Sequence, residues 1–173
     1  LMVCNDSNRE VVRVLCTLDV TEGAVDYAIS NNFDVIVSHH PLIFSPLKVM
    51  NTSDAKARRI MKLLSHNISV MSFHSRLDAA PGGLNDIFAK LIGLADVQTV
   101  VADGEAVCRI GTLSNPSTCA EFASFIKKTL QAERVLYAES GNIVQRVAIC
   151  GGDGKDFVKA VKAAGADSYL TGQ

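Results

Sequence analysis

Three of the four histidines are close together in the sequence and have a carboxylate nearby. His39 and His40 are adjacent and precede Pro41, and His74 is followed four residues later by Asp78. Imidazole and carboxylate groups are common ligands of transition metals. Two adjacent histidines rarely bind one ion from a regular strand, because successive side chains point to opposite faces, but at a strand end the chain can bend and bring both round. Pro41 restricts His40 to extended conformations and fixes the direction of that bend.

This pattern predicts a site for two neighbouring divalent ions. His39 and His40 would each serve one ion, and Asp78 would bridge the two. Two ions about 3.5–4 Å apart are a common hydrolytic arrangement, because they lower the pKa of a water and clamp the reacting oxygens. The His-x-x-x-Asp spacing of His74 and Asp78, at the end of the next predicted strand, adds to this prediction. The alternative for the His-His pair is a capping, surface or packing role, and His66 is expected to be structural.

The elements that would position these residues alternate between short apolar strands and helices. Strands are expected over 11–18, 35–37 and 68–73, and helices over 21–30 and 53–65. Parallel strands joined by helices place their carboxyl ends at one edge of the sheet, where ligands bind. The His-His pair follows the second strand and His74 follows the third, so both segments are expected at that edge.

The remainder of the chain is expected to continue in the same manner. Strands are expected over 97–102, 106–113, 135–138, 144–150 and 167–170, and helices over 84–92, 117–130 and 155–164. Asp103-Gly104 is expected to join the first two of these strands. The segment 151–154 is expected to be a tight strand-to-helix turn, with a phosphate-binding loop as the alternative.

These expectations define the fold class and its organisation. They predict an α/β fold with a mostly parallel sheet, helices on both faces, and a site at the carboxyl ends of the strands. Two similar α/β lobes are expected, over about 1–95 and 96–173.

Composition limits the classes of partner. The 173 residues include 17 Lys and Arg and 18 Asp and Glu, so the net charge is −1. Nucleic-acid binding is therefore not expected, and no apolar run approaches the roughly 18–20 residues of a membrane helix. Five cysteines at positions 4, 16, 108, 119 and 150 contain no C-x-x-C motif. The sequence predicts that they are reduced and that the protein is cytoplasmic.

The segments around the histidines resemble the NGG-one-interacting-factor-three-like family. Its members are also described as type 2 homologues of GTP cyclohydrolase 1. The segments that match in order are 18–21 (LDVT), 37–44 (VSHHPLIF), 73–86 (FHSRLDAAPGGLND), 147–152 (VAICGG) and 169–172 (YLTG). The usual second motif of the family is His-Thr-Asn-Leu-Asp, so Ser75-Arg76 departs from it.

The resemblance implies a two-metal site in an α/β fold and a ring-like homo-oligomer, usually a hexamer. His39, His40 and Asp78 match the family's metal-binding positions, and His74 matches a histidine beside the ligands. His74 is therefore expected to be a further ligand, a partner that orients the ligands, or an acid–base group. The leading hypothesis is a metal-dependent hydrolase of a small nucleotide-like or phosphorylated substrate. The alternatives are a metal-binding interaction or metal-delivery protein without turnover, and a structural metal site. Histidine and carboxylate ligands suit zinc, iron, manganese, nickel and cobalt alike.

The family pattern extends beyond both ends of this sequence. The family has an N-terminal helix, and it has a His and a Glu on one helical turn shortly after the Thr-Gly segment. Since this sequence runs from Leu1 to Gln173, both ends are expected to be cut. Two ions need roughly six to ten ligand contacts, so we expect this chain to bind metal weakly or at one position.

Overall fold

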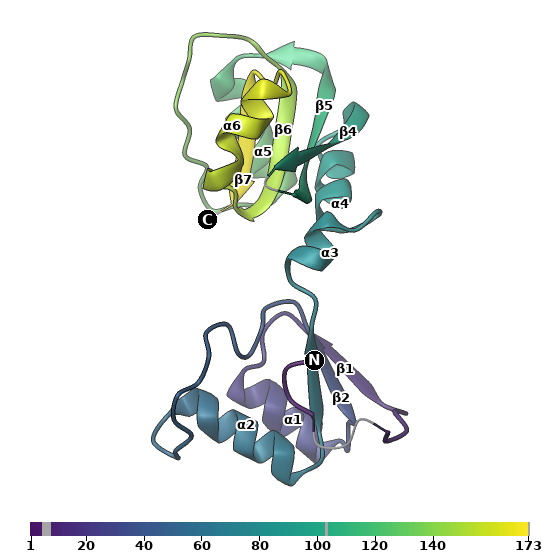
Figure 1. Cartoon of the computed structure of the whole chain (residues 1–173). Coiled ribbons are helices and arrows are strands. Elements are labelled where there is room, and N and C mark those ends of the chain that lie inside the picture. The colour runs from purple at the N-terminus through teal and green to yellow at the C-terminus, as the bar shows by residue number, and fades with distance from the viewer. Residues whose placement is uncertain (5–7, 103, 173) are drawn as a thin grey trace. The chain divides into compact units, whose positions relative to one another are not determined.

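The structure is a computed structural model that describes residues 1–4, 8–102 and 104–172. The chain divides into two compact units, Leu1–His74 and Ser75–Gln173. In each unit a sheet packs against helices (Figure 1), so the α/β class is confirmed. The division between the units precedes the lobe boundary near residue 95 that the sequence suggested.

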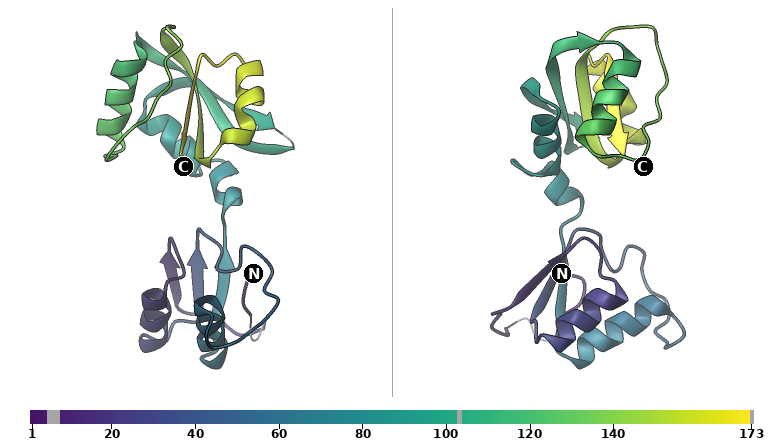
Figure 2. Two further views of the ribbon diagram at one scale, coloured as in Figure 1. Left: turned by 90° about the vertical axis from the view of Figure 1, so that its left-hand side faces the viewer. Right: turned by 180° about the vertical axis from the view of Figure 1, so that it is seen from behind.

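The first unit is built on a parallel three-stranded sheet in the order β1-β2-β3. Its elements are β1 (Val14–Thr17), α1 (Glu22–Ser30), β2 (Val35–Ser38), α2 (Ala55–Ser65) and β3 (Ser69–Ser72). Both helices cover the same face of the sheet (Figure 2). The sequence predicted helices on both faces, and the two long helices of this unit do not follow that prediction. The parallel order of these strands agrees with the sequence.

Helix caps and apolar packing explain why these segments fold as they do. The Thr21 hydroxyl accepts a hydrogen bond from the amide of Ala24 at 3.1 Å, and Asp54 accepts one from Ala57 at 2.7 Å. Each cap satisfies an amide that the helix leaves free and contributes about 1 kcal/mol. The core between the helices and the sheet consists of Val3, Val20, Val25, Ala28, Ile36, Leu42, Ile60, Leu63, Ile68 and Val70.

The second unit contains a four-stranded sheet in the order β4-β5-β6-β7. Its elements are α3 (Ser75–Ala79), α4 (Leu84–Leu91), β4 (Leu94–Ala102), β5 (Glu105–Ser117), α5 (Cys119–Thr129), β6 (Val144–Asp153), a 3-10 helix (Lys155–Phe157), α6 (Val158–Ala163) and β7 (Ser168–Gly172). β5 pairs antiparallel with both β4 and β6, and only β6 and β7 are parallel. The prediction of a mostly parallel sheet is therefore wrong for this unit. The connection from β4 to β5 is too short for a parallel crossover, which needs a dozen residues or more.

Three further details of this unit differ from the sequence expectations. Residues 135–138 form no strand, and the Leu136 side chain is 81% exposed. Residues 151–153 belong to β6 instead of a turn, and the helix that follows begins with a 3-10 segment. For the expected turn at Asp103-Gly104, Asp103 lies outside the described residues, while Gly104 has a φ of 80°.

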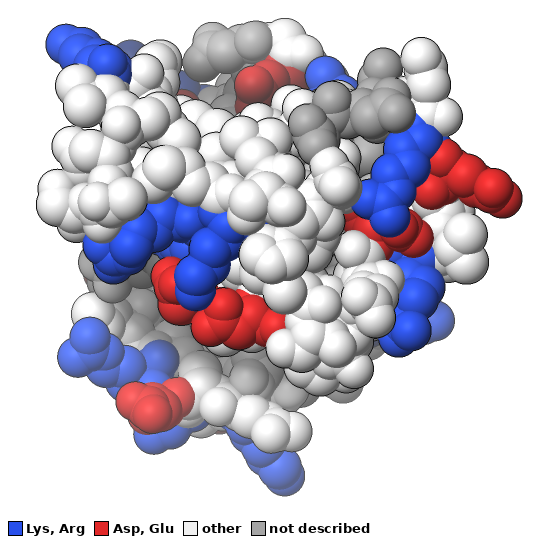
Figure 3. All heavy atoms as spheres, turned by 90° about the horizontal axis from the view of Figure 1, so that it is seen from below, with Lys and Arg blue, Asp and Glu red and all other residues white. Residues whose placement is uncertain are grey.

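Within the part of the chain that the structure describes, no helix is both long and apolar enough to cross a membrane. On the face drawn in Figure 3, acidic and basic side chains are mixed and neither forms a continuous field. In the first unit, for example, Lys62 pairs with Glu22 at 2.6 Å and with Asp26 at 2.9 Å.

Candidate metal centre

Three imidazoles meet at the carboxyl edge of the parallel sheet in the first unit. His39 and His40 follow β2 directly, and His74 follows β3 after one intervening residue. One potential ligand atom from each imidazole lies within 4.8 Å of the other two. The ring centroids are 4.9 Å apart for His39 and His40, 5.2 Å for His39 and His74, and 5.7 Å for His40 and His74. The predicted convergence of these two segments is confirmed.

A hydrogen bond between two serine side chains joins the ends of β2 and β3 next to the histidine segments. Ser38 and Ser72 are paired across the two parallel strands, and their hydroxyl oxygens are 2.8 Å apart. The Ser38 hydroxyl also donates to the carbonyl of His40 at 2.8 Å. Ser38 is only 2% exposed, so this hydroxyl is a buried polar group with two partners. The two hydrogen bonds fix the bend that follows β2 and hold it against β3.

The backbone of the His-His pair is anchored on its other side by the end of β1. The His39 amide donates to the carbonyl of Thr17 at 3.2 Å, and the His40 amide donates to the carbonyl of Leu18 at 3.0 Å. These contacts continue the pairing of β1 with β2 beyond the last regular residues. The backbone that carries two of the three imidazoles is therefore held by both neighbouring strands, which limits the freedom of the side chains.

Asp19 is a site residue that the sequence reasoning missed. Its Oδ1 lies 2.8 Å from Nδ1 of His40, and its carbonyl accepts a hydrogen bond from the Thr17 hydroxyl at 3.0 Å. A histidine that donates Nδ1–H to a carboxylate presents Nε2 as the free ligand atom and becomes a better ligand. Both side chains are about half exposed, so the contact orients the imidazole more than it stabilises the fold. The sequence could have identified Asp19, because this residue follows β1 and so lies at the same sheet edge as the histidines.

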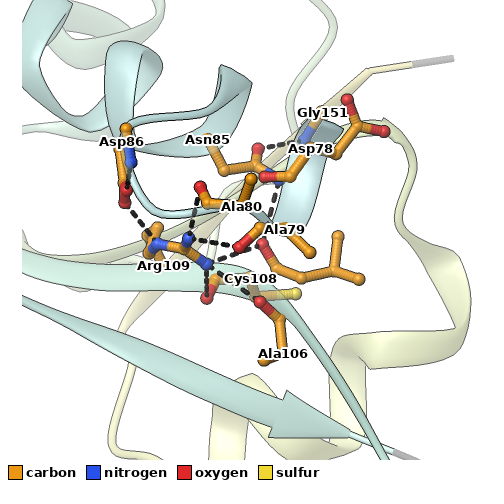
Figure 4. A network of polar contacts seen from close by, with 11 residues as sticks. Asp78, Ala79, Ala80, Asn85, Asp86, Ala106, Cys108, Arg109 and Gly151 are labelled. Atoms are coloured by element: carbon orange, nitrogen blue, oxygen red, sulfur yellow. Dashed lines mark hydrogen bonds and ion pairs between the residues drawn. The ribbon is translucent and has the colours of Figure 1, made fainter. Parts of the chain in front are cut away.

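Asp78, the predicted bridging ligand, belongs to the second unit, where it is 7% exposed in α3. Its backbone is held by Asn85, whose side-chain amide donates to the carbonyl of Asp78 at 3.2 Å and to that of Val107 at 2.9 Å. The Asn85 oxygen accepts from the amide of Gly151 at 2.7 Å (Figure 4). Asn85 therefore connects α3 to two strands. The ligand role of Asp78 stays a prediction.

Arg109 on β5 fixes the turn that follows Asp78. Arg109 is 3% exposed, and its guanidinium donates to the carbonyls of Ala79 at 2.9 Å and of Ala80 at 3.5 Å. It also donates to the carboxylate of Asp86, and this hydrogen bond lowers the pKa of Asp86. A buried guanidinium is tolerated only when its donors are satisfied, which this arrangement achieves. Sequence reasoning did not find this residue.

His66 lies outside the group of three imidazoles. It caps the carboxyl end of α2, where its Nδ1 is 2.9 Å from the carbonyl oxygen of Lys62. A histidine at the end of a helix interacts favourably with the helix dipole. The metal-capable group that the structure forms among its described residues contains His39, His40 and His74.

Comparison with known proteins gives consistent results over the whole chain. The family described as Duf34/NIF3 (NGG1p interacting factor 3) matches residues 1–173. The chain is 30% identical to the GTP cyclohydrolase 1 type 2 homolog of Clostridium perfringens, over 99% of this chain and 67% of that protein. It is 33% identical to the homolog of the same name from Streptococcus pneumoniae, over 95% of this chain and 64% of that protein. The chain thus spans about two thirds of the length of these relatives.

Solved structures show the same similarity. The hypothetical protein SA1388 of Staphylococcus aureus has a TM-score of 0.84 and 26% identity, covering 99% of this chain and 70% of that one. The protein ybgI, described as of unknown function, has a TM-score of 0.81 and 27% identity, covering 100% of this chain and 68% of that one.

Proposed function

The chain belongs to the DUF34/NIF3 family, and on this premise we propose that its imidazoles form part of the metal centre of a metal-dependent hydrolase. The proposed substrate is a small nucleotide-like or phosphorylated molecule, in keeping with the name GTP cyclohydrolase 1 type 2 homolog that relatives carry. The observation that carries this proposal is the convergence of His39, His40 and His74 from the ends of two paired strands.

The donor set of the first unit fits a divalent transition metal. Three imidazoles with a carboxylate behind one of them are ligands of the kind that zinc, iron, manganese, nickel and cobalt accept. His39 and His40 would hold the ion, with His40 oriented by Asp19. A divalent ion bound there would supply Lewis acidity, which polarises a phosphoryl or carbonyl oxygen and acidifies water.

His74 is proposed to act either as a third ligand or as an acid–base group. It is the most exposed of the three imidazoles. Exposure gives it access to solvent protons, and an imidazole is able to take up and release a proton near neutral pH. The family resemblance adds Asp78 as a further proposed ligand, together with a second ion, a ring-like hexamer and a cytoplasmic location.

The proposal is tested by assaying the metal-loaded protein against a panel of nucleotides and phosphoesters, beside the variants His40→Ala and His66→Ala. Metal-dependent hydrolysis that His40→Ala abolishes and His66→Ala retains is the expected result. Stoichiometric metal binding without turnover of any member of the panel would contradict the hydrolase proposal and favour a metal-binding interaction or delivery protein. Circular dichroism of each variant establishes that a lost activity does not reflect a lost fold.

A further inference from the structure

Two cysteines of the second unit face each other across neighbouring antiparallel strands. Arg109 on β5 is paired with Ile149 on β6, so the adjacent step of the same register places Cys108 opposite Cys150. Directly opposed residues on antiparallel strands have Cα atoms about 4.5–5.5 Å apart. Disulfides span Cα separations of roughly 4.4–6.8 Å, so the backbone already meets the geometric requirement.

The two side chains also point toward one another. The interaction with the Cys150 thiol is the main reason that the pKa of Cys108 is lowered to about 7. The same interaction, together with burial, raises the pKa of the Cys150 thiol. The Tyr169 hydroxyl on β7 lies 3.9 Å from the sulfur of Cys108. The pair therefore combines a thiol whose pKa is lowered with a neighbouring thiol whose pKa is raised.

Burial separates this pair from the other cysteines. Cys108 is 1% exposed and Cys150 is 3% exposed, and both lie in an apolar cluster with Val161 of α6. Cys16, by contrast, is exposed. A small oxidant reaches the buried pair more readily than a bulky disulfide such as oxidised glutathione does, which limits the class of reagent that can modify it.

We propose that Cys108 and Cys150 are a reversible modification site, which a hydroperoxide converts into a disulfide between β5 and β6. The Cys108 sulfur attacks a peroxide oxygen, so that an S–O bond forms, the O–O bond breaks, and the departing hydroxide takes the Cys108 proton as water. The Cys150 sulfur then attacks the sulfenic sulfur, an S–S bond forms, the S–O bond breaks, and a second water leaves with the Cys150 proton. Two electrons and two protons pass from the thiols to one hydrogen peroxide.

The residues that follow the two cysteines are hydrogen-bonded to the segment around Asp78, so a disulfide can affect that segment. Arg109 follows Cys108 and holds the carbonyls of Ala79 and Ala80. Gly151 follows Cys150 and donates to Asn85, the side chain that holds the carbonyl of Asp78. A disulfide would tie β5 to β6 beside both anchors of the Asp78 segment (Figure 4). An effect on metal binding through Asp78 rests on the proposed function, whereas formation of the disulfide does not.

The test uses the whole chain with Cys4, Cys16 and Cys119 replaced by Ser, which leaves the pair as its only thiols. After treatment with hydrogen peroxide, the protein is denatured, alkylated and weighed intact. We expect a loss of about 2 Da, no alkylation, and recovery of two alkylated thiols after reduction by dithiothreitol. In the same background, Cys150→Ala should gain oxygen on Cys108, whereas Cys108→Ala should keep Cys150 reduced and alkylatable, and neither variant should show the loss of about 2 Da.

A second measurement uses the unaltered chain, so its result does not depend on whether the variants fold. Trypsin without reduction should release peptides 91–109 and 147–155 joined to each other after peroxide treatment, since these peptides carry the two cysteines. Two outcomes would overturn the proposal. One is that both thiols stay alkylatable under conditions that oxidise Cys16 of the unaltered chain. The other is that the pair forms only intermolecular disulfides or sulfinic acid.

Discussion

The carboxylate of Asp19 and the imidazole of His40 are joined by a 2.8 Å contact between Oδ1 and Nδ1. Asp19 follows β1 and His40 follows β2, so the contact links two neighbouring strand ends of one parallel sheet. This relationship selects Nε2 of His40 as the atom that is left for a metal ion. It also gives the proposed centre a supporting residue that can be altered without removing a proposed ligand.

Replacing Asp19 should weaken metal binding without abolishing it. Loss of a carboxylate behind a histidine ligand typically costs about 10–100-fold in affinity, because the imidazole loses its orientation and part of its basicity. We expect Asp19→Ala to show this loss, and Asp19→Asn to show less of it, since an amide oxygen still accepts the Nδ1 hydrogen. Competition with a chelating indicator measures both affinities.

Asp26 offers a matched control for this comparison. It is an exposed carboxylate on α1 that pairs with Lys62 and lies outside the imidazole group. Asp26→Asn should leave the metal affinity unchanged. Equal affinities for Asp19→Ala and Asp26→Asn would show that the Asp19 contact has no role in the centre.

The buried hydroxyl of Ser38 should matter for both stability and binding. Ser38→Ala leaves the carbonyl of His40 and the hydroxyl of Ser72 without this partner, which costs about 1–3 kcal/mol in the free energy of unfolding. Ser65→Ala is the control, because the Ser65 hydroxyl bonds to Lys62 at an exposed helix end and its loss should cost at most about 0.5 kcal/mol. Urea denaturation compares the two, and equal midpoints would contradict the structural role of Ser38.

The contact between Arg109 and Asp86 should make stability depend on pH in the acidic range. The hydrogen bond from Arg109 lowers the pKa of Asp86 below its ordinary value of 3.8. A lowered carboxyl pKa means that its stabilisation is present above pH 3.8 and is lost as the pH falls through the folded-state value. Asp86→Asn should therefore lose less stability than the unaltered chain between about pH 4 and the folded-state pKa.

Denaturation midpoints measured across that range provide the readout. Asp156→Asn serves as a comparison, because Asp156 is an exposed carboxylate in the 3-10 helix. This variant should follow the pH dependence of the unaltered chain. If Asp86→Asn also showed the pH dependence of the unaltered chain, Asp86 would contribute nothing to the acid sensitivity of the protein.

The predictable part of the site is the part that depends on strand order. His39, His40 and His74 follow successive parallel strands, and strand ends that share an edge bring such residues together whatever the details of packing. Asp19 follows the first strand of the same sheet, so the same reasoning applied to β1 would have found it. Arg109 could not be found in this way, because the carbonyls of Ala79 and Ala80 that it holds lie about thirty positions away in the sequence.

In the sheet of the second unit, the alternation of apolar strands and helical segments did not predict the strand direction correctly. Apolar strands separated by helical segments predict parallel pairing, but β4 and β5 are joined at Gly104 with no helix between them. A tight connection reverses the chain and requires antiparallel strands. Residues 135–138 have the composition of a strand, yet they pair with no other strand, so composition alone does not establish sheet membership.

The most direct test of the metal centre is to titrate the metal-free chain with Co²⁺ and to follow binding by visible absorption. The titration is carried out on the unaltered protein and on four variants: His39→Ala, His40→Ala, His74→Ala and His66→Ala. The account predicts saturable binding with a ligand-field spectrum that reports nitrogen ligands. It predicts weaker binding by at least about tenfold in His39→Ala and His40→Ala, a changed spectrum in His74→Ala if that imidazole is a ligand, and no change in His66→Ala. Absence of saturable binding in the unaltered chain, or binding that His39→Ala and His40→Ala leave intact, would contradict it.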